Sequence, residues 1–290
     1  MVFYSPVQII AKGATAGKYK TDLSVQNMLI RGFMAGAYIA MGAALATTCY
    51  TGTAEFLGVG MAKLIMGAAF PVGLIIIVAT GAELFTGDAM LAPLAAFIHK
   101  ISWKSVFNLW IWVYIGNLIG SVFFAYIMAN GPFVTFDATG AATVNAFGLT
   151  AVNIALAKVS YVGIMGSWSL FLKAVGCNWL VNLAILLGIC ADDLIGKFFG
   201  IWFPIMAFVS LGFEHCVANM YFIPAGLIDA GYLSPDQIAT IGAEKIANLT
   251  WVTMWTNNLI VATIGNIVGG MIFVGILYWI AFKKEIEALE

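Results

Sequence analysis

The apolar positions of the chain fall into six long stretches, near residues 30–50, 62–98, 105–130, 160–190, 197–228 and 257–282. A hydrocarbon core about 30 Å thick requires roughly 20 apolar residues in a helix that crosses it. Every stretch reaches that length, but the second and fifth are too long and too interrupted for a single straight helix. The pattern predicts an all-α integral membrane protein with six transmembrane helices, of which the second and fifth are broken.

The composition agrees with a chain that lies in lipid. Of 290 residues, 62% are hydrophobic and 9% are charged, and the mean hydropathy is +0.98. A water-soluble protein of this size needs more polar residues on its surface. The net charge of -1, without a basic face, excludes nucleic acid as an expected partner. Isolated cysteines in apolar segments predict buried free thiols and neither a metal nor a cofactor: Cys49, Cys177, Cys190 and Cys216.

Basic residues predict the orientation in a plasma membrane. With both termini and the loops after the second and fourth stretches on one side, that side holds nine of the 13 Lys and Arg residues: Lys12, Lys18, Lys20, Arg31, Lys100, Lys104, Lys197, Lys283 and Lys284. Such an excess marks the cytoplasmic side, so both termini are predicted there. Residues 1–27 lack the apolar core of a cleavable signal peptide and are expected to lie at the interface, where they would plug the pore.

The two halves of the chain resemble each other. "YIGNLIG" at Tyr114–Gly120 matches "TIGNIVG" at Thr263–Gly269, and a Phe-Pro before an apolar run that ends in Gly-x-Glu occurs at both 70–83 and 203–214. Each half has three spans, an odd number, so the second half enters the membrane from the opposite side. This predicts an aquaporin-like inverted repeat with a substrate path where the broken helices meet, in three segments: 1–27 (cytoplasmic), 28–135 (helices 1–3) and 136–290 (helices 4–6 and a short cytoplasmic C-terminus).

Polar residues interrupt the second and fifth stretches. "GAELFTGD" at Gly81–Asp88 and "GFEHCVAN" at Gly212–Asn219 place irregular backbone where lipid cannot satisfy peptide groups, so both must be buried or line a cavity. An ionisable group within a membrane costs about 2.5 kcal/mol or more and is by default a functional candidate. We therefore expect Thr86 and His215 to face a shared pathway.

Other polar residues near the interruptions are expected to have structural roles. Glu83 and Glu214 can accept backbone N–H groups at the next helix start and cap it, although Glu214 also adjoins His215 and can set its charge. The repeated glycines provide small-xxx-small spacing for close helix approach. Asn117 and Asn266 beside them have the alternative role of bonding to the broken loops.

Four motifs together resemble the formate/nitrite transporter family: "GAELFTGD", "GFEHCVANMYFIP", "CNWLVNLA" at Cys177–Ala184, and "TIGNIVGG". The similarity covers essentially the whole chain, with the motifs in the same order. It implies a homopentamer in which each protomer has its own pore. It also implies site residues: the central histidine His215, the loop threonine Thr86, a cytoplasmic constriction at Phe70 and Leu74, a periplasmic one at Phe208, lining residues Leu84, Phe85 and Val181, and recurrent polar positions Asn178 and Asn219.

The resemblance also implies a lysine in the outer vestibule. Lys158 precedes Asn178 by 20 residues, a longer gap than the family motif has, whereas Lys173 matches a basic position nearer the opposite face. We assign the vestibule lysine to Lys158.

The implied function is passage of small monovalent weak-acid anions, with formate the expected substrate and nitrite or hydrosulfide the alternatives. Desolvation between apolar rings is costly for a bare anion and raises a weak acid's pKa. Three alternatives stay open for the proton: the anion receives it from the central histidine His215, receives it from water in the vestibule, or crosses without one. An aquaglyceroporin would carry Asn-Pro-Ala, and the chain contains no Asn-Pro; an ammonium channel needs twin pore histidines. Cys216 beside His215 leaves a membrane-embedded enzyme as a remote alternative, and the expectation is a non-enzyme.

Overall fold

The computed structural model describes the backbone of residues 3–287. Residues 1–2 and 288–290, which begin the first predicted segment and end the third, lie outside the described residues. Five helices in this part of the chain are long and apolar enough to cross a membrane: Val25–Tyr50, Thr53–Thr80, Trp103–Ala129, Gly163–Cys190 and Trp251–Ile286. The chain is therefore helical with apolar spans, as predicted. The fifth predicted span is absent from this set because it is divided into two shorter helices.

The helices that build the first half are α1 (Pro6–Thr21), α2 (Val25–Tyr50), α3 (Thr53–Ala69), α4 (Val72–Thr80), α5 (Phe85–Phe97) and α6 (Trp103–Ala129). Pro71 lacks an N–H and separates α3 from α4. The polar stretch 81–84 separates α4 from α5, and Gly81 at φ +75° begins it with a left-handed turn that ends α4. We call residues 81–84 the first break.

The second half contains α7 (Ala146–Lys158), α8 (Gly163–Cys190), α9 (Leu194–Ser210), α10 (Cys216–Asp229), η1 (Ala230–Tyr232), α11 (Pro235–Ile241), α12 (Ala243–Ala247), α13 (Trp251–Met254), η2 (Trp255–Leu259), α14 (Ile260–Ile267), η3 (Val268–Ile276) and α15 (Leu277–Glu287). Residues 211–215, the second break, separate α9 from α10, and Gly212 at φ +72° takes the same left-handed turn as Gly81. Both interruptions thus fall where the sequence predicts them.

Small residues allow two helix pairs to approach closely. A Cβ atom at Gly120 of α6 would lie 2.0 Å from the carbonyl oxygen of Phe33 in α2. In the second half, a Cβ atom at Gly269 would lie 2.4 Å from the carbonyl oxygen of Val175 in α8. Both contacts are shorter than any real Cβ contact, so only glycine fits. The predicted role of the repeated small-xxx-small glycines is confirmed.

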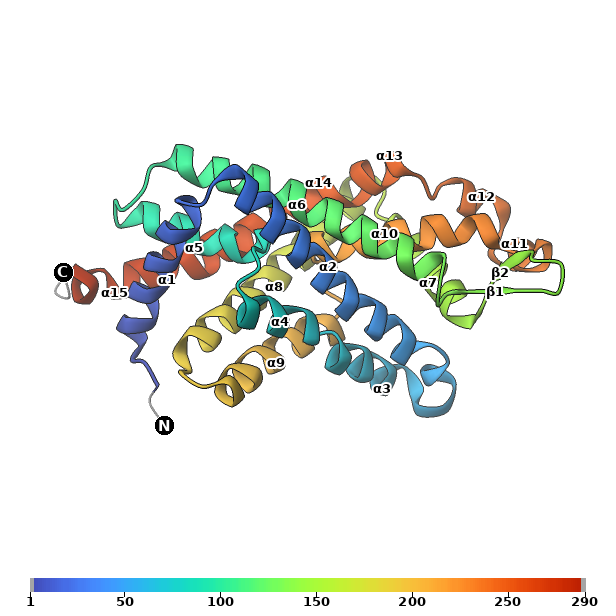
Figure 1. Cartoon of the computed structure of the whole chain (residues 1–290), viewed down its shortest axis with the longest axis horizontal. Coiled ribbons are helices and arrows are strands. Elements are labelled where there is room, and N and C mark those ends of the chain that lie inside the picture. The colour runs from blue at the N-terminus through green and yellow to red at the C-terminus, as the bar shows by residue number, and fades with distance from the viewer. Residues whose placement is uncertain (1–2, 288–290) are drawn as a thin grey trace.

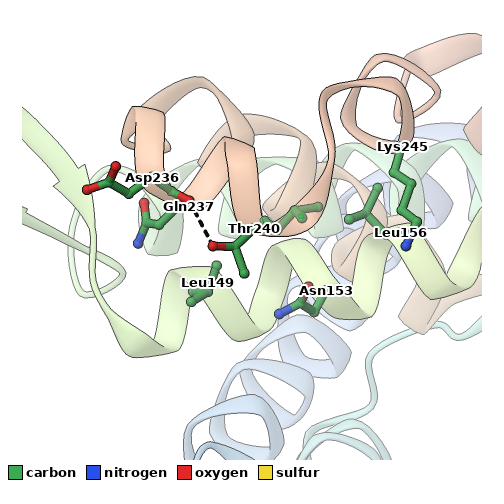
Figure 2. Close-up of a pocket in the computed structure, with 8 residues that line it drawn as sticks. Leu149, Asn153, Leu156, Asp236, Gln237, Thr240 and Lys245 are labelled. Atoms are coloured by element: carbon green, nitrogen blue, oxygen red, sulfur yellow. Dashed lines mark hydrogen bonds between the residues drawn. The ribbon is translucent and has the colours of Figure 1, made fainter.

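The remaining elements lie at the two ends of the molecule. Helices α1, α5 and α15 gather at one end, and the antiparallel pair β1 (Val134–Phe136) and β2 (Ala142–Val144) lies with α7, α11 and α12 at the other (Figure 1). Helices α11 and α12 cover α7 and leave a cavity of about 500 Å³ beside Asn153 and Lys245 (Figure 2). Neither break contributes to this cavity, so substitutions of its lining residues can serve as controls for substitutions at the breaks.

Candidate functional site

The first break is held by one asparagine and one carbonyl of α2. The N–H of Glu83 donates to the carbonyl of Arg31 at 3.2 Å. The amide of Asn117 donates to the carbonyls of Glu83 at 2.9 Å and Gly32 at 2.8 Å, and its oxygen accepts from the N–H of Phe85 at 3.0 Å. Asn117 is fully buried. It thus satisfies peptide groups that an unbroken helix would have paired internally.

The second break has the same hydrogen bonds at equivalent positions. The N–H of Glu214 donates to the carbonyl of Lys173 at 3.3 Å. Asn266 donates to the carbonyls of Glu214 at 2.9 Å and Ala174 at 2.8 Å, and it accepts from the N–H of Cys216 at 2.8 Å. The hydrogen bonds therefore relate Glu83 to Glu214 and make each asparagine the brace of its own break.

Thr86 and His215 meet between the breaks. The Thr86 hydroxyl lies 2.9 Å from His215 Nε2, and both residues are buried. Nδ1 of His215 accepts the N–H of Ala218 at 3.0 Å, so it carries no proton and the histidine is the neutral tautomer with its proton on Nε2. Nε2–H then donates to the Thr86 oxygen, which leaves the threonine hydroxyl proton free to be donated to a ligand.

The asparagines of α8 fix the other side of the threonine. Asn178 and Asn182 donate to the carbonyl of Thr86 at 3.0 and 3.1 Å, and all three residues are fully buried. Asn178 also donates to the carbonyl of Asn266 at 2.6 Å, which ties the threonine to the brace of the second break. Thr86 is therefore held by partners that all come from the second half of the chain, His215 at its hydroxyl and the two asparagines at its carbonyl.

Two cavities flank this pair. The Lys158 cavity has a volume of about 170 Å³ and is lined by Lys158, His215 and further residues that include Lys63, Phe70, Phe208 and Asn219. The Lys20 cavity, of about 340 Å³, is lined by Lys20 of α1, by Gly87 next to Thr86, and by others that include Arg31, Leu74, Glu83, Leu84 and Lys197. The buried Thr86–His215 pair thus separates two spaces that each contain ammonium groups.

Aromatic rings form the apolar wall of the Lys158 cavity. Phe208 stacks on the His215 ring with centroids 5.9 Å apart. Phe70 meets Phe208 edge to face at 5.7 Å, and both phenylalanines are buried. An anion that reaches the histidine must therefore leave most of its water behind.

Glu214 is the hub of the charged groups at the Lys158 cavity. One carboxylate oxygen accepts from Lys158 at 2.8 Å and from Asn219 at 2.7 Å, and the other accepts from the Tyr161 hydroxyl at 3.0 Å. Lys173 donates to the same hydroxyl at 2.9 Å. Two cations and one carboxylate are thus joined in one network.

Glu83 has the equivalent place at the Lys20 cavity. Lys20 donates to its carboxylate, and the Arg31 guanidinium lies 3.7 Å from it. Arg31 also donates to the Tyr19 hydroxyl at 3.2 Å, as Lys173 does to Tyr161. A second carboxylate, that of Asp88, lies 3.0 Å from the Lys20 nitrogen. This network contains two cations and two carboxylates.

Several sequence expectations require correction. Glu83 and Glu214 do not cap the following helices: their carboxylates bind side chains, and the N-cap positions are Leu84 and His215. Lys173 is not near the opposite face, because Tyr161 joins it to the same carboxylate as Lys158.

Three further apolar residues of the predicted site lie as follows. Phe70 packs on Phe208 in the Lys158 cavity, whereas Leu74 lines the Lys20 cavity, so a constriction formed by Phe70 and Leu74 stays a prediction. Phe85 turns away from both cavities and packs against Trp110 and Tyr114 at an apolar groove between α6 and α14. Val181 is buried in α8, where it lines neither cavity.

Other residues of the two networks had no role assigned from sequence. In the sequence, Lys20 was used only as one of the basic residues that predict orientation, because the segment that forms α1 belongs to neither predicted repeat. Asp88 lies inside "GAELFTGD", and its distance of five residues from Glu83 equals that of Asn219 from Glu214. That equal spacing is the signal that could have identified it. Tyr161 carries no comparable signal, since an isolated tyrosine before a span is ordinary at membrane interfaces.

The apolar spans, with a buried polar pair between two charged cavities, are features of an integral membrane transport protein. The family model "Formate/nitrite transporter" matches residues 7–280. The "Probable formate transporter" of Methanothermobacter thermautotrophicus is 40% identical over 98% of each chain, and the formate channel FocA of Escherichia coli (strain K12) is 33% identical over 97% of this chain and 95% of its own. The chain belongs to the formate/nitrite transporter family.

The fold agrees with solved structures. A "Pentameric formate channel with formate bound" superposes with a TM-score of 0.75 at 34% identity, covering 89% of this chain and 98% of its own. An "FNT family ion channel" gives a TM-score of 0.77 at 30% identity, with 94% and 98% covered. The family resemblance inferred from the four motifs is therefore confirmed.

Proposed function

We propose that the chain conducts small monovalent weak-acid anions, formate foremost, through a pore in each protomer of a plasma-membrane homopentamer. The observation that carries the proposal is the hydrogen-bonded Thr86–His215 pair, buried between two cavities that contain lysines. Relatives named as formate transporters and channels, and a solved pentameric relative with formate bound, support the substrate and the assembly.

The equivalent hydrogen bonds of the two breaks support an inverted repeat. We place six crossings in the chain, with α3–α5 as the second and α9–α10 as the fifth, and we keep the segments 1–27, 28–135 and 136–290. Because α1, α5 and α15 lie at one end of the molecule (Figure 1), that end and the Lys20 cavity face the cytoplasm, as the basic residues predict. The Lys158 cavity then faces the outside.

The geometry supports a simple sequence of events. An anion enters the Lys158 cavity because Lys158 and Lys63 attract it. As it approaches the phenylalanines it loses water, which raises the pKa of the acid and favours its neutral form. The free hydroxyl proton of Thr86 then binds the carboxylate, helped by the positive N-terminal ends of α5 and α10. The acid leaves through the Lys20 cavity.

Proton coupling through His215 has a structural requirement. Its Nδ1 accepts the N–H of Ala218, so the ring can take up a second proton only if that hydrogen bond breaks. We propose that Nδ1 takes up a proton from water when this hydrogen bond breaks, and that the resulting imidazolium gives one proton to the anion and becomes neutral again. A histidine that stays neutral would donate a hydrogen bond but would not transfer a proton to the substrate.

Flux into proteoliposomes tests the function. Labelled formate, nitrite and hydrosulfide are compared across external pH from about 5 to 8, the interval in which histidine titrates. We expect wild-type protein to prefer formate and His215→Phe to lose its rate and its pH dependence. Wild-type rate and pH response in His215→Phe would exclude the central role, and equal passage of the three anions would leave a weak-acid pore without formate selectivity.

A further inference from the structure

We propose that Asp88 weakens anion binding at the Lys20 end of the pathway, because its carboxylate occupies the Lys20 ammonium as an internal substitute for the substrate. The two mouths of the pore then differ in affinity, with tighter capture at the Lys158 end. Asp88 lies beside the pathway and acts through Lys20, so it is a positioning residue. This inference rests on the proposed function.

The surroundings of Asp88 leave it dependent on Lys20. Its side chain is fully buried, and one oxygen lies 3.0 Å from the Lys20 nitrogen. Apart from that ammonium, neither carboxylate oxygen has a hydrogen-bond donor among the described residues. A buried carboxylate with one partner is costly to uncouple from it. Lys20 is therefore held by Asp88 and Glu83 together and is poorly available to a third carboxylate.

The other break lacks this second carboxylate. Asn219 follows Glu214 by five residues, as Asp88 follows Glu83. The Asn219 amide donates to Glu214 at 2.7 Å and to Asn258 of η2 at 2.7 Å. It therefore takes up part of the hydrogen-bonding capacity of Glu214 without adding charge. Lys158 thus forms an ion pair with one carboxylate, whereas Lys20 forms ion pairs with two.

The charges of the two ends differ by this one group. At one end, the two carboxylates of Glu83 and Asp88 balance the two cations Lys20 and Arg31. At the other end, the single carboxylate of Glu214 balances only one of the two cations there, so one positive charge is in excess. One further lysine lines each cavity, Lys197 in the Lys20 cavity and Lys63 in the Lys158 cavity, so these two leave the difference in charge between the ends unchanged. An anion thus meets a neutral network at one end and a positive one at the other.

Exchange of the two side chains tests the inference. Initial rates of labelled formate entry are measured against formate concentration in right-side-out and everted membrane vesicles. We expect Asp88→Asn to lower the half-saturating concentration roughly five- to tenfold at the Lys20 face and to change it less than about twofold at the other face. The reciprocal Asn219→Asp should raise it at the Lys158 face by a similar factor, and Asp88→Glu, which keeps the charge, should stay near wild type.

The outcomes separate the two proposals. An equal shift at both faces, or a fall in maximal rate with unchanged half-saturation, would overturn the role of Asp88 and leave the pore intact. Absence of formate entry in wild-type vesicles of both orientations would instead overturn the proposed function. Should Asp88→Asn fail to assemble, Asn219→Asp decides, since an unchanged half-saturation at the Lys158 face would refute the comparison on which the inference depends.

Discussion

The two breaks have the same backbone arrangement but different charge. In each, an asparagine from a neighbouring helix bonds to the carbonyl before the new helix and to its first N–H, and a glutamate N–H bonds to a carbonyl of an earlier long helix. The glutamate side chains differ in what surrounds them. Glu214 has a tyrosine and an asparagine beside its lysine, whereas Glu83 shares its lysine with Asp88.

The difference follows from what lipid permits. Peptide groups in a broken membrane helix have no water to bind, so each break needs a donor and an acceptor at fixed positions, and asparagine provides both in one side chain. Side-chain charge is constrained only by local balance, which several sets of residues satisfy. Equal backbone bonds with unequal charges therefore allow each mouth of the pore to have its own affinity.

The largest expected effect tests the shared backbone. Replacement of either brace, Asn117→Leu or Asn266→Leu, removes a hydrogen bond from three backbone groups. Two of them, the glutamate carbonyl and the first N–H of the new helix, then have no partner among the described residues, and each such group costs about 1–3 kcal/mol. We expect both variants to lose at least about 10 °C of melting temperature in detergent, or to fail to assemble.

The control for these variants is Asn153→Leu, at an exposed position beside the α7–α11 cavity shown in Figure 2. It should melt within about 2 °C of wild type. A large loss in one brace variant with none in the other would show that the two breaks are not equivalent.

The next effect tests the difference in charge. Lys20 and Lys158 are similarly buried, with 16% and 17% of the side chain exposed. Lys20→Met leaves the buried Asp88 carboxylate without a partner and Glu83 with Arg31 alone, and it should cost about 3–5 kcal/mol. Lys158→Met leaves Glu214 with its tyrosine and asparagine donors and should cost about half as much. Thermal melting of the purified protein at neutral pH measures both.

A double variant identifies the cause. Asp88→Asn in the Lys20→Met background removes the carboxylate that has lost its partner, since Glu83 keeps Arg31, and should restore much of the lost stability. Lys245→Met, on the exposed surface of α12, is the matched control for loss of a lysine and should be close to neutral. Equal losses in Lys20→Met and Lys158→Met would contradict the unequal carboxylate count.

Sequence patterns predicted the parts of the molecule that peptide chemistry determines. Apolar length indicated the spans, and the glycine-rich polar stretches indicated both breaks, because lipid does not tolerate such residues in an exposed, continuous helix. The pairing of Thr86 with His215 also followed, since both belong to the polar interruptions that were expected to face one pathway. These predictions depend on local spacing or on the repeat.

Side-chain direction and distant partners could not be obtained in this way. Phe85 faces α6 instead of the pathway because one turn at the start of α5 decides its direction. Lys20 reaches Glu83 because α1 packs against α5 so closely that a Cβ atom at Gly17 would lie 2.0 Å from the carbonyl oxygen of Leu91. No periodicity in α1 indicates this contact, so the partner of Glu83 becomes visible only in the fold.

The smallest effect distinguishes the two tyrosines that end the networks. The Tyr161 hydroxyl joins Lys173 to Glu214, whereas that of Tyr19 accepts from Arg31 and its side chain is 55% exposed. Tyr161→Phe removes both charged contacts and should cost about 1 kcal/mol, a fall of roughly 2–4 °C in melting temperature. Tyr19→Phe should stay within about 0.5 kcal/mol of wild type, because water replaces the lost partner of Arg31. If Tyr19→Phe proved the more damaging, the Lys20 network would depend on α1 through its tyrosine as well as its lysine, and the balance of charges around Asp88 would no longer describe that end of the pore.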